Sequence, residues 1–398
     1  MNLKSKNKDL FLILLIYLAL SPLCFAQNVD GYCFKTGADR PELYIPLLKN
    51  KNIAVVTNPT GLLHDRTFLV DFLVKNSIVI RTIFAPEHGF RGEADAGEHV
   101  SNGRDSKTGI PIVSLYGSNK KPTAQQLKGT DVILFDIQDV GVRFYTYIST
   151  LTYVMEAAAE NGIEVIVLDR PNPHDGYIDG PVLKDPWKSF VGMHPVPVVY
   201  GLTIGEYGKM VNGEKWLKNG VVARYTLIPM LNYHKTQRHG VVEKPSPNLP
   251  NDKAINLYPS LCFFEGTQVS VGRGTALPFQ IYGSPWTKGL PFQFTPKPAV
   301  GAKDPFLNGK RCYGENLSAF PEELSAINLN WLWSAYHHYK NSKQDFFLSN
   351  LFFDKLAGND ELRRQLITGK SVEEVRASWK KDLDVFQKIR EKYVIYED

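Results

Sequence analysis

The sequence is poor in cysteine and carries no strong excess of one charge. Its 398 residues include only four cysteines, which are too few and too irregularly spaced for a disulfide scaffold or a zinc site. Lysine and arginine number 46 against 41 aspartates and glutamates, and this small excess is spread evenly along the chain. We therefore expect a globular protein that buries a core without disulfides and binds no nucleic acid.

Several motifs of catalysis and cofactor binding are also missing. The chain contains no Gly-x-Ser-x-Gly turn, no phosphate-binding Gly-x4-Gly-Lys-Ser/Thr loop and no His-Glu-x-x-His. The first predicted strand ends in Asn-Pro-Thr-Gly and not in a Gly-x-Gly-x-x-Gly turn, which argues against a dinucleotide. The sequence thus predicts neither a bound cofactor nor a metal site.

A long apolar run occurs only near the N-terminus. Three lysines precede the run Leu10–Leu20, which is too short to span a bilayer, and a small residue, Ala26, follows shortly after it. This order is typical of a secretory signal peptide. We predict that residues 1–26 are removed on secretion across the inner membrane and that the mature protein, which has no integral membrane segment, is periplasmic. An uncleaved N-terminal anchor is the alternative.

Short runs rich in valine and isoleucine alternate with helical patterns in the first half of the mature chain. Runs of this kind, with little polar alternation, are typical of strands buried on both faces. The predicted strands are Ile53–Thr57, Ile78–Phe84, Ile112–Leu115, Val132–Phe135 and Ile163–Leu168, and the predicted helices are Thr67–Lys75, Thr123–Lys128 and Tyr145–Asn161. The alternation indicates the α/β class, with a doubly wound, Rossmann-like parallel sheet.

The second half of the chain has a different character. Glu243–Asn251 is a loop rich in proline and asparagine, and a capping box at Ser371 predicts a helix that runs toward Tyr393. We therefore predict a Rossmann-like catalytic domain over residues 27–235 and a smaller α/β domain over residues 236–398, with a cleft between them.

Polar side chains gather where the predicted strands end. Ligands of doubly wound sheets bind beyond the carboxyl ends of the strands, so these residues are candidates for a site. They are Asn58, Glu87, His88, Glu93, Asp136, Asp139, Arg143, Asp169, Arg170 and Asn172. A cleft lined by them would be rich in carboxylates and hydrogen-bonding groups.

Glu87 is the leading candidate for a general acid. It stands in a loop, Pro86-Glu-His-Gly89, directly after the strand Ile78–Phe84. Partial desolvation in such a loop raises the pKa of a carboxyl group, as a general acid at neutral pH requires. The structural alternative is that Glu87 caps the next turn or pairs with Arg91. The acidic segment Glu93–Glu98 is expected mostly on a solvated loop face.

The segment after the strand Val132–Phe135 allows two interpretations. Asp136 or Asp139 binds sugar hydroxyls while Arg143 binds an anionic group, or Asp136 and Arg143 form a structural ion pair. Tyr145 offers its ring to a sugar, or packs as part of a helix face.

Glu265 stands among apolar residues, where burying an unpaired carboxylate is energetically costly. The nearby Cys262 is expected to be a buried core residue. We predict that Arg273 is the partner of Glu265, either in the cleft or in a structural pair.

Eight of these segments, taken in order, resemble the exo-beta-N-acetylmuramidase family NamZ. They are Asn58-Pro-Thr-Gly, Pro86-Glu-His-Gly-Phe-Arg-Gly, Ser114-Leu-Tyr-Gly, Phe135-Asp-Ile-Gln-Asp-Val-Gly-Val-Arg, Leu168-Asp-Arg-Pro-Asn-Pro, Pro245-Ser-Pro-Asn, Phe264-Glu-Gly-Thr and Gly272-Arg-Gly-Thr. The resemblance implies a glycoside hydrolase of peptidoglycan recycling, which releases N-acetylmuramic acid from the non-reducing ends of fragments. It also implies a Rossmann-like domain, a smaller α/β domain and a cleft between them.

The resemblance assigns the acid/base role to Glu87 first, and then to Glu93, Asp136 or Glu265. N-acetylmuramic acid carries a lactyl carboxylate, and a guanidinium matches a carboxylate in a two-pronged hydrogen bond. Arg143 and Arg273 are therefore the residues expected to select a muramyl sugar.

The expected partner is a peptidoglycan-derived muropeptide or disaccharide. Retaining, inverting and substrate-assisted mechanisms remain open. The alternative functions are a beta-N-acetylglucosaminidase, another exo-glycosidase, or a periplasmic sugar-binding protein.

Overall fold

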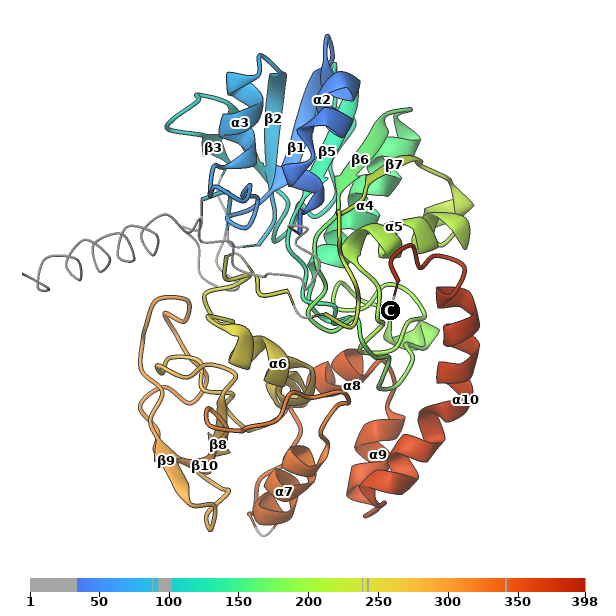
Figure 1. Cartoon of the computed structure of the whole chain (residues 1–398). Helices are drawn as coiled ribbons and strands as arrows, with labels where there is room; N and C mark the ends of the chain where they lie inside the picture. The colour runs from blue at the N-terminus through green and yellow to red at the C-terminus, as the bar shows by residue number, and fades with distance from the viewer. Residues whose placement is uncertain are drawn as a thin grey trace, which may run out of the picture. The chain divides into compact units, whose positions relative to one another are not determined.

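A seven-stranded, mostly parallel sheet forms the first half of the protein (Figure 1). The computed structural model describes residues 34–87, 89–91, 102–237, 239–241, 243–340 and 342–397. The strands, in the spatial order β3-β4-β2-β1-β5-β6-β7, are β1 (Asn52–Thr57), β2 (Val79–Ala85), β3 (Gly103–Arg104), β4 (Pro111–Ser114), β5 (Val132–Asp136), β6 (Glu164–Leu168) and β7 (Arg224–Ile228). All neighbours pair in parallel except β3 and β4. This confirms the predicted Rossmann-like sheet.

Helices cover both faces of the sheet, because successive residues of the central strands point to opposite sides. They are α2 (Pro41–Leu48), α3 (Leu69–Lys75), α4 (Tyr147–Glu160) and α5 (Ile204–Gly213). Ile53 and Val55 of β1 pack in one hydrophobic cluster with residues of α2 and α3, whereas Ala54 and Val56 belong to a second cluster with α4 and α5. Burial on both faces explains why the strands read as almost unbroken apolar runs.

The predicted helix Thr123–Lys128 is wrong, since residues 124–129 form turns. Thr123 and Gln126 exchange backbone-to-side-chain hydrogen bonds of 2.8 and 3.2 Å, as at the start of a helix. Gly129, at a φ of 75°, stops this start within one turn. The strands β3 and β7 were not predicted from the sequence.

The second half combines helices with a small antiparallel sheet. Its elements are α6 (Asp252–Leu261), the 3-10 helix η4 (Cys262–Gly266), β8 (Ile281–Ser284), β9 (Phe292–Phe294), β10 (Cys312–Asn316), α7 (Asn330–Tyr339), α8 (Phe352–Ala357), α9 (Glu361–Ile367) and α10 (Val372–Arg390), and the sheet order is β8-β10-β9. Three further 3-10 helices lie in the first half: η1 (Gly37–Asp39), η2 (Asp185–Trp187) and η3 (Lys218–Gly220). The expected smaller second domain is thus present.

The chain returns to the first half through α10 (Figure 1). The predicted capping box is confirmed, because Ser371 Oγ accepts a hydrogen bond from the backbone N–H of Glu374 at 3.2 Å. Beyond α10, the Tyr396 hydroxyl donates to Asp169 Oδ2 at 2.7 Å. Within the described part of the chain, no helix has both the length and the apolar character needed to cross a membrane.

Arg143 ties the two halves together. Its fully buried guanidinium donates hydrogen bonds to the carbonyls of Pro181 and Val196 through Nη1, at 2.8 and 2.7 Å. Nη2 donates to the carbonyl of Leu356 in α8 at 2.8 Å. Burial lowers the pKa of Arg143 to about 9. Arg143 therefore acts as a structural connection within the protein.

We predict that Arg143→Met lowers the free energy of unfolding by about 3 kcal/mol, because three buried carbonyls each lose a donor worth roughly 1 kcal/mol. Denaturant unfolding of the mature protein measures the change. Arg311→Met is the matched control, since Arg311 is exposed. Equal unfolding free energies for the two variants would contradict the assignment.

Candidate active site

The polar residues after β5 and β6 form a buried ion pair. Arg170 donates to Asp136 through Nε at 2.6 Å and through Nη2 at 2.8 Å, and both side chains are buried. The predicted ion pair between Asp136 and Arg143 is therefore wrong: Arg170 is the partner. Sequence reasoning could not choose between the two arginines, because the choice depends on the order of the strands in space.

Asn58 and Asn172 hold loops. Asn58 Oδ1 accepts hydrogen bonds from the backbone N–H of Thr60 at 2.9 Å and from its hydroxyl at 2.5 Å. Asn172 Oδ1 accepts from the backbone N–H of His174 at 2.7 Å, and its Nδ2 donates to the carbonyl of Leu202 at 2.8 Å. Both asparagines are buried.

Asp139 is a third buried group after β5. Its Oδ2 accepts hydrogen bonds from the Tyr200 hydroxyl at 2.5 Å and from the backbone N–H of Gly141 at 2.7 Å. Burial raises the pKa of Asp139 to about 6, against these hydrogen bonds. Gly141 adopts a φ of 72°, and a Cβ there would lie 1.8 Å from Asn172 Oδ1.

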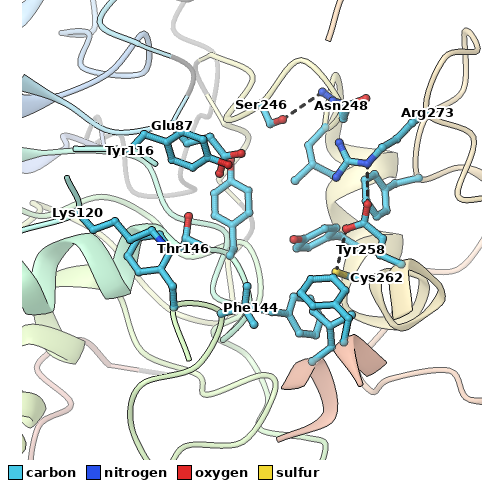
Figure 2. Close-up of a pocket in the computed structure, with 18 of the residues that line it drawn as sticks. Glu87, Tyr116, Lys120, Phe144, Thr146, Ser246, Asn248, Tyr258, Cys262 and Arg273 are labelled. Atoms are coloured by element: carbon cyan, nitrogen blue, oxygen red, sulfur yellow. Dashed lines mark hydrogen bonds and ion pairs between the residues drawn. The ribbon is translucent and has the colours of Figure 1, made fainter. Parts of the chain in front are cut away.

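A cavity of about 500 Å³ brings together four of the predicted site residues (Figure 2). They are Glu87, Tyr145, Glu265 and Arg273. The volume lies in the range typical of small-molecule sites, and the lining comes from both halves of the chain. Asn58, Asp136, Asp139, Arg143, Arg170 and Asn172 do not line this cavity. His88 and Glu93 lie outside the described residues.

Glu87 and Tyr116 form one wall of the cavity (Figure 2). Glu87 follows β2 and Tyr116 follows β4, and these strands are paired, with Ala85 opposite Ser114. The two side chains share a hydrogen bond. Burial, reinforced by the charge of Glu87, raises the pKa of Tyr116 above its ordinary value.

Arg273 stands on the opposite wall (Figure 2), and Glu265 lines the same cavity. Arg273 Nε donates to Glu265 Oε1 at 2.7 Å, which confirms the predicted partner. The thiol of Cys262, a buried residue as predicted, donates to Glu265 Oε2 at 3.7 Å. Burial opposes the charge of the guanidinium, but the Glu265 carboxylate outweighs this effect and holds the pKa of Arg273 above its usual value.

Aromatic side chains supply apolar surface to the cavity. Phe144 and Tyr145 each meet the ring of Tyr258 edge to face, with centroids 5.4 and 5.8 Å apart. The Tyr145 hydroxyl donates to the carbonyl of Pro245 at 2.6 Å, so its polar end is already bound. Tyr145 therefore both packs in the core and lines the cavity, and such rings suit the apolar face of a sugar.

Lining residues that were not among the sequence candidates include Tyr116, Lys120, Ser246 and Asn248. Tyr116 belongs to the segment Ser114-Leu-Tyr-Gly, and the strand-end rule applied to β4 would have identified it. Ser246 and Asn248 stand in Pro245-Ser-Pro-Asn, where Ser246 Oγ accepts from the Asn248 backbone N–H at 3.1 Å. The described residues contain no group of three or more histidines, cysteines and carboxylates that could hold a metal ion.

Two family models match the chain. They are those of exo-beta-N-acetylmuramidase NamZ, the N-terminal part over residues 53–253 and the C-terminal part over residues 256–396. The chain is also 40% identical over 376 residues to the peptidoglycan beta-N-acetylmuramidase NamZ of Bacillus subtilis (strain 168), a match that covers 89% of each protein.

Two crystal structures of DUF1343 family proteins from Bacteroides fragilis NCTC 9343 have the same fold. One has a TM-score of 0.84 and 44% sequence identity, and the other a TM-score of 0.79 and 31% identity. Each match covers 92% of this chain and 99% of the other.

We predict that Asp139→Asn changes how stability depends on pH. Between about pH 4 and 6, the folded wild type retains a proton on Asp139 that the unfolded chain has lost, so wild-type stability falls as the pH rises. Asparagine accepts the same two hydrogen bonds but does not titrate. Relative to the variant, the wild type should lose up to about 3 kcal/mol across this interval, as denaturant unfolding at each pH measures. A difference that stays constant with pH would contradict this assignment.

Proposed function

The chain belongs to the exo-beta-N-acetylmuramidase NamZ family, and on that premise we propose that it releases N-acetylmuramic acid from the non-reducing ends of peptidoglycan fragments. The observation that carries the proposal is that Glu87 and Glu265 line one cavity. Glycoside hydrolysis generally requires two such carboxyl groups, one to protonate the leaving oxygen and one to assist the attack.

The partners of the two carboxyl groups divide these roles. Glu265 is one half of an ion pair, so protonating it would leave the charge of Arg273 uncompensated in a partly buried site. Glu87 lines the same cavity and shares a hydrogen bond with the hydroxyl of Tyr116. Because Glu265 is held as an anion by Arg273, we assign the general-acid role to Glu87. Glu265 orients the attacking group, which is water or the 2-acetamido oxygen of the substrate.

The proposed substrate is a peptidoglycan-derived muropeptide or disaccharide. Its N-acetylmuramic acid ring packs on the aromatic surface made by Phe144, Tyr145 and Tyr258, with the glycosidic oxygen directed at Glu87. Ser246 and Asn248, at the edge of the same cavity, offer polar groups to the sugar.

We also propose that the protein acts in the periplasm after loss of residues 1–26. The order of basic, apolar and small residues at the N-terminus supports export. A peptidoglycan substrate supports the same location, because the polymer lies outside the inner membrane.

Replacing Glu87 by Gln should affect two substrates unequally. On N-acetylmuramyl-N-acetylglucosamine, kcat/KM should fall by about 10²- to 10⁴-fold, because the leaving sugar must be protonated. On 4-nitrophenyl N-acetyl-beta-muraminide the fall should be much smaller, since nitrophenolate leaves without a proton. Steady-state kinetics on both substrates measures the difference.

Glu373→Gln is the matched control, because Glu373 is exposed on α10, and it should retain wild-type rates on both substrates. Glu265→Gln should lose activity on both to a similar extent, as expected for a group that assists the attack. Equal losses on the two substrates for Glu87→Gln would exclude Glu87 as the general acid. Absence of muraminide hydrolysis by the wild type would contradict the proposed function.

The export proposal predicts a mature N-terminus at Gln27. Full-length protein expressed in a Gram-negative host should be recovered from the periplasmic fraction, and intact mass spectrometry should show the loss of residues 1–26. Recovery of the uncut chain in the membrane fraction would instead establish an N-terminal anchor.

A further inference from the structure

Among the described residues, the cavity offers two cationic side chains to a substrate, Arg273 and Lys120. Arg143, which was also expected to bind the lactyl carboxylate, is buried away from the cavity and donates to three carbonyls. Arg273 and Lys120 are therefore the two candidates, among the described lining residues, for binding a substrate carboxylate.

Arg273 already has a carboxylate partner. Its Nε lies 2.7 Å from Glu265 Oε1, and its guanidinium also lies over the ring of Phe279, 4.9 Å from the centroid. The pair carries no net charge, so it attracts a second carboxylate only weakly. Turning Arg273 toward a ligand would also leave Glu265 without its cation.

Lys120 is placed differently from the lysine beside it. Lys121 lies 3.2 Å from a carboxylate oxygen of Glu156 and 2.7 Å from one of Glu160. Lys120 lines the cavity, with its ammonium 4.5 Å from the centroid of the Phe190 ring, and no carboxylate in the described part of the chain forms an ion pair with it. A cation–π contact positions an ammonium without neutralising it.

The aromatic support of Lys120 is itself fixed. The ring of Phe190 stacks on that of Tyr153, with centroids 6.0 Å apart and an interplanar angle of 13°. The carbonyl of Phe190 accepts a hydrogen bond from Ser149 Oγ of α4 at 2.7 Å. The ammonium is therefore held at the cavity by a half-buried ring that is itself anchored to α4 through Ser149 and Tyr153.

The loop after β4 places Lys120 on the same side of the cavity as the general acid (Figure 2). Gly117 turns the chain at a φ of 74°, and Asn119 Nδ2 donates to the carbonyl of Ser114 at 2.7 Å. One short loop thus presents both Tyr116, the partner of Glu87, and Lys120.

We propose that Lys120 binds the lactyl carboxylate of N-acetylmuramic acid and so distinguishes muramyl from glucosaminyl sugars. The inference rests on the proposed function, because it assumes a muramyl ligand in this cavity. The lactyl carboxylate is ionised at neutral pH and forms a charge-assisted hydrogen bond with the ammonium. N-acetylglucosamine lacks the lactyl group and gains nothing from the lysine.

Calorimetric titration with free N-acetylmuramic acid and free N-acetylglucosamine tests this assignment. In the wild type, the muramyl sugar should bind more tightly. In Lys120→Met, the preference for N-acetylmuramic acid over N-acetylglucosamine, measured as the ratio of their dissociation constants, should decrease by about 10- to 100-fold. This is the range expected for the loss of a hydrogen bond to a charged group. Lys120→Arg should recover most of the preference, because it restores the positive charge.

Lys128→Met is the matched control, since Lys128 is exposed and does not line the cavity, and it should keep the wild-type ratio. A Lys120→Met variant that keeps the wild-type preference would overturn the assignment. A preference that is lost only in Arg273→Met, and not in Lys120→Met, would overturn it in favour of the guanidinium.

The binding measurement separates the failure of this inference from failure of the proposed function, because it needs no turnover. Wild-type binding of N-acetylmuramic acid that depends on Lys120, without hydrolysis of the muraminide, would support the binding residue and reject the enzyme. Hydrolysis of the muraminide with a preference independent of Lys120 would support the enzyme and reject the binding residue.

Discussion

The cavity depends on the buried hydrogen bonds of Arg143. Phe144 and Tyr145, which follow Arg143 directly in the sequence, form part of the cavity lining. Leu356, whose carbonyl accepts from Arg143, lines the cavity from α8. One guanidinium thus fixes two walls against each other. A long side chain with several planar donors suits this role, because it satisfies carbonyls from separate segments that would otherwise be buried without partners.

The strand order explains why the site lies beside β2 and β4. The chain runs outward from β1 through β2 to β4 and then returns to β5 on the other side of β1, so the topological switch lies between β1 and β5. The buried Asp136–Arg170 ion pair lies at the carboxyl ends of β5 and β6 and does not line the cavity. Glu87 and Tyr116, which do line it, follow the neighbouring strands β2 and β4.

The sequence predicted the fold well because burial on both faces marks strands directly. It predicted the Glu265–Arg273 pair because a carboxylate among apolar residues needs a cation, whatever the details of the fold. It predicted Arg143 as a ligand-binding residue, whereas the structure uses Arg143 as a connection, because composition cannot tell a buried carbonyl cluster from a bound anion. Lys120 and Lys121 show the same limit: they are adjacent and identical in type, and only the packing of Phe190 and α4 gives them different surroundings.

Each half of the protein contributes a different electrostatic element to the cavity. The second half supplies Glu265 with its charge already compensated by Arg273. The loop of Arg273 packs closely against the backbone of Lys297, and this requires glycine at position 274: its φ is 76°, and a Cβ there would lie only 2.5 Å from the carbonyl oxygen of Lys297. The first half supplies Glu87 beside a neutral hydroxyl, and Lys120 as an ammonium without a carboxylate partner among the described residues. A ligand carrying one carboxylate and one glycosidic oxygen is complementary to this arrangement, because it adds the anion that Lys120 lacks and places the leaving oxygen near Glu87. Neither half alone holds all of these groups, so the geometry of catalysis depends on the contacts that join the two halves.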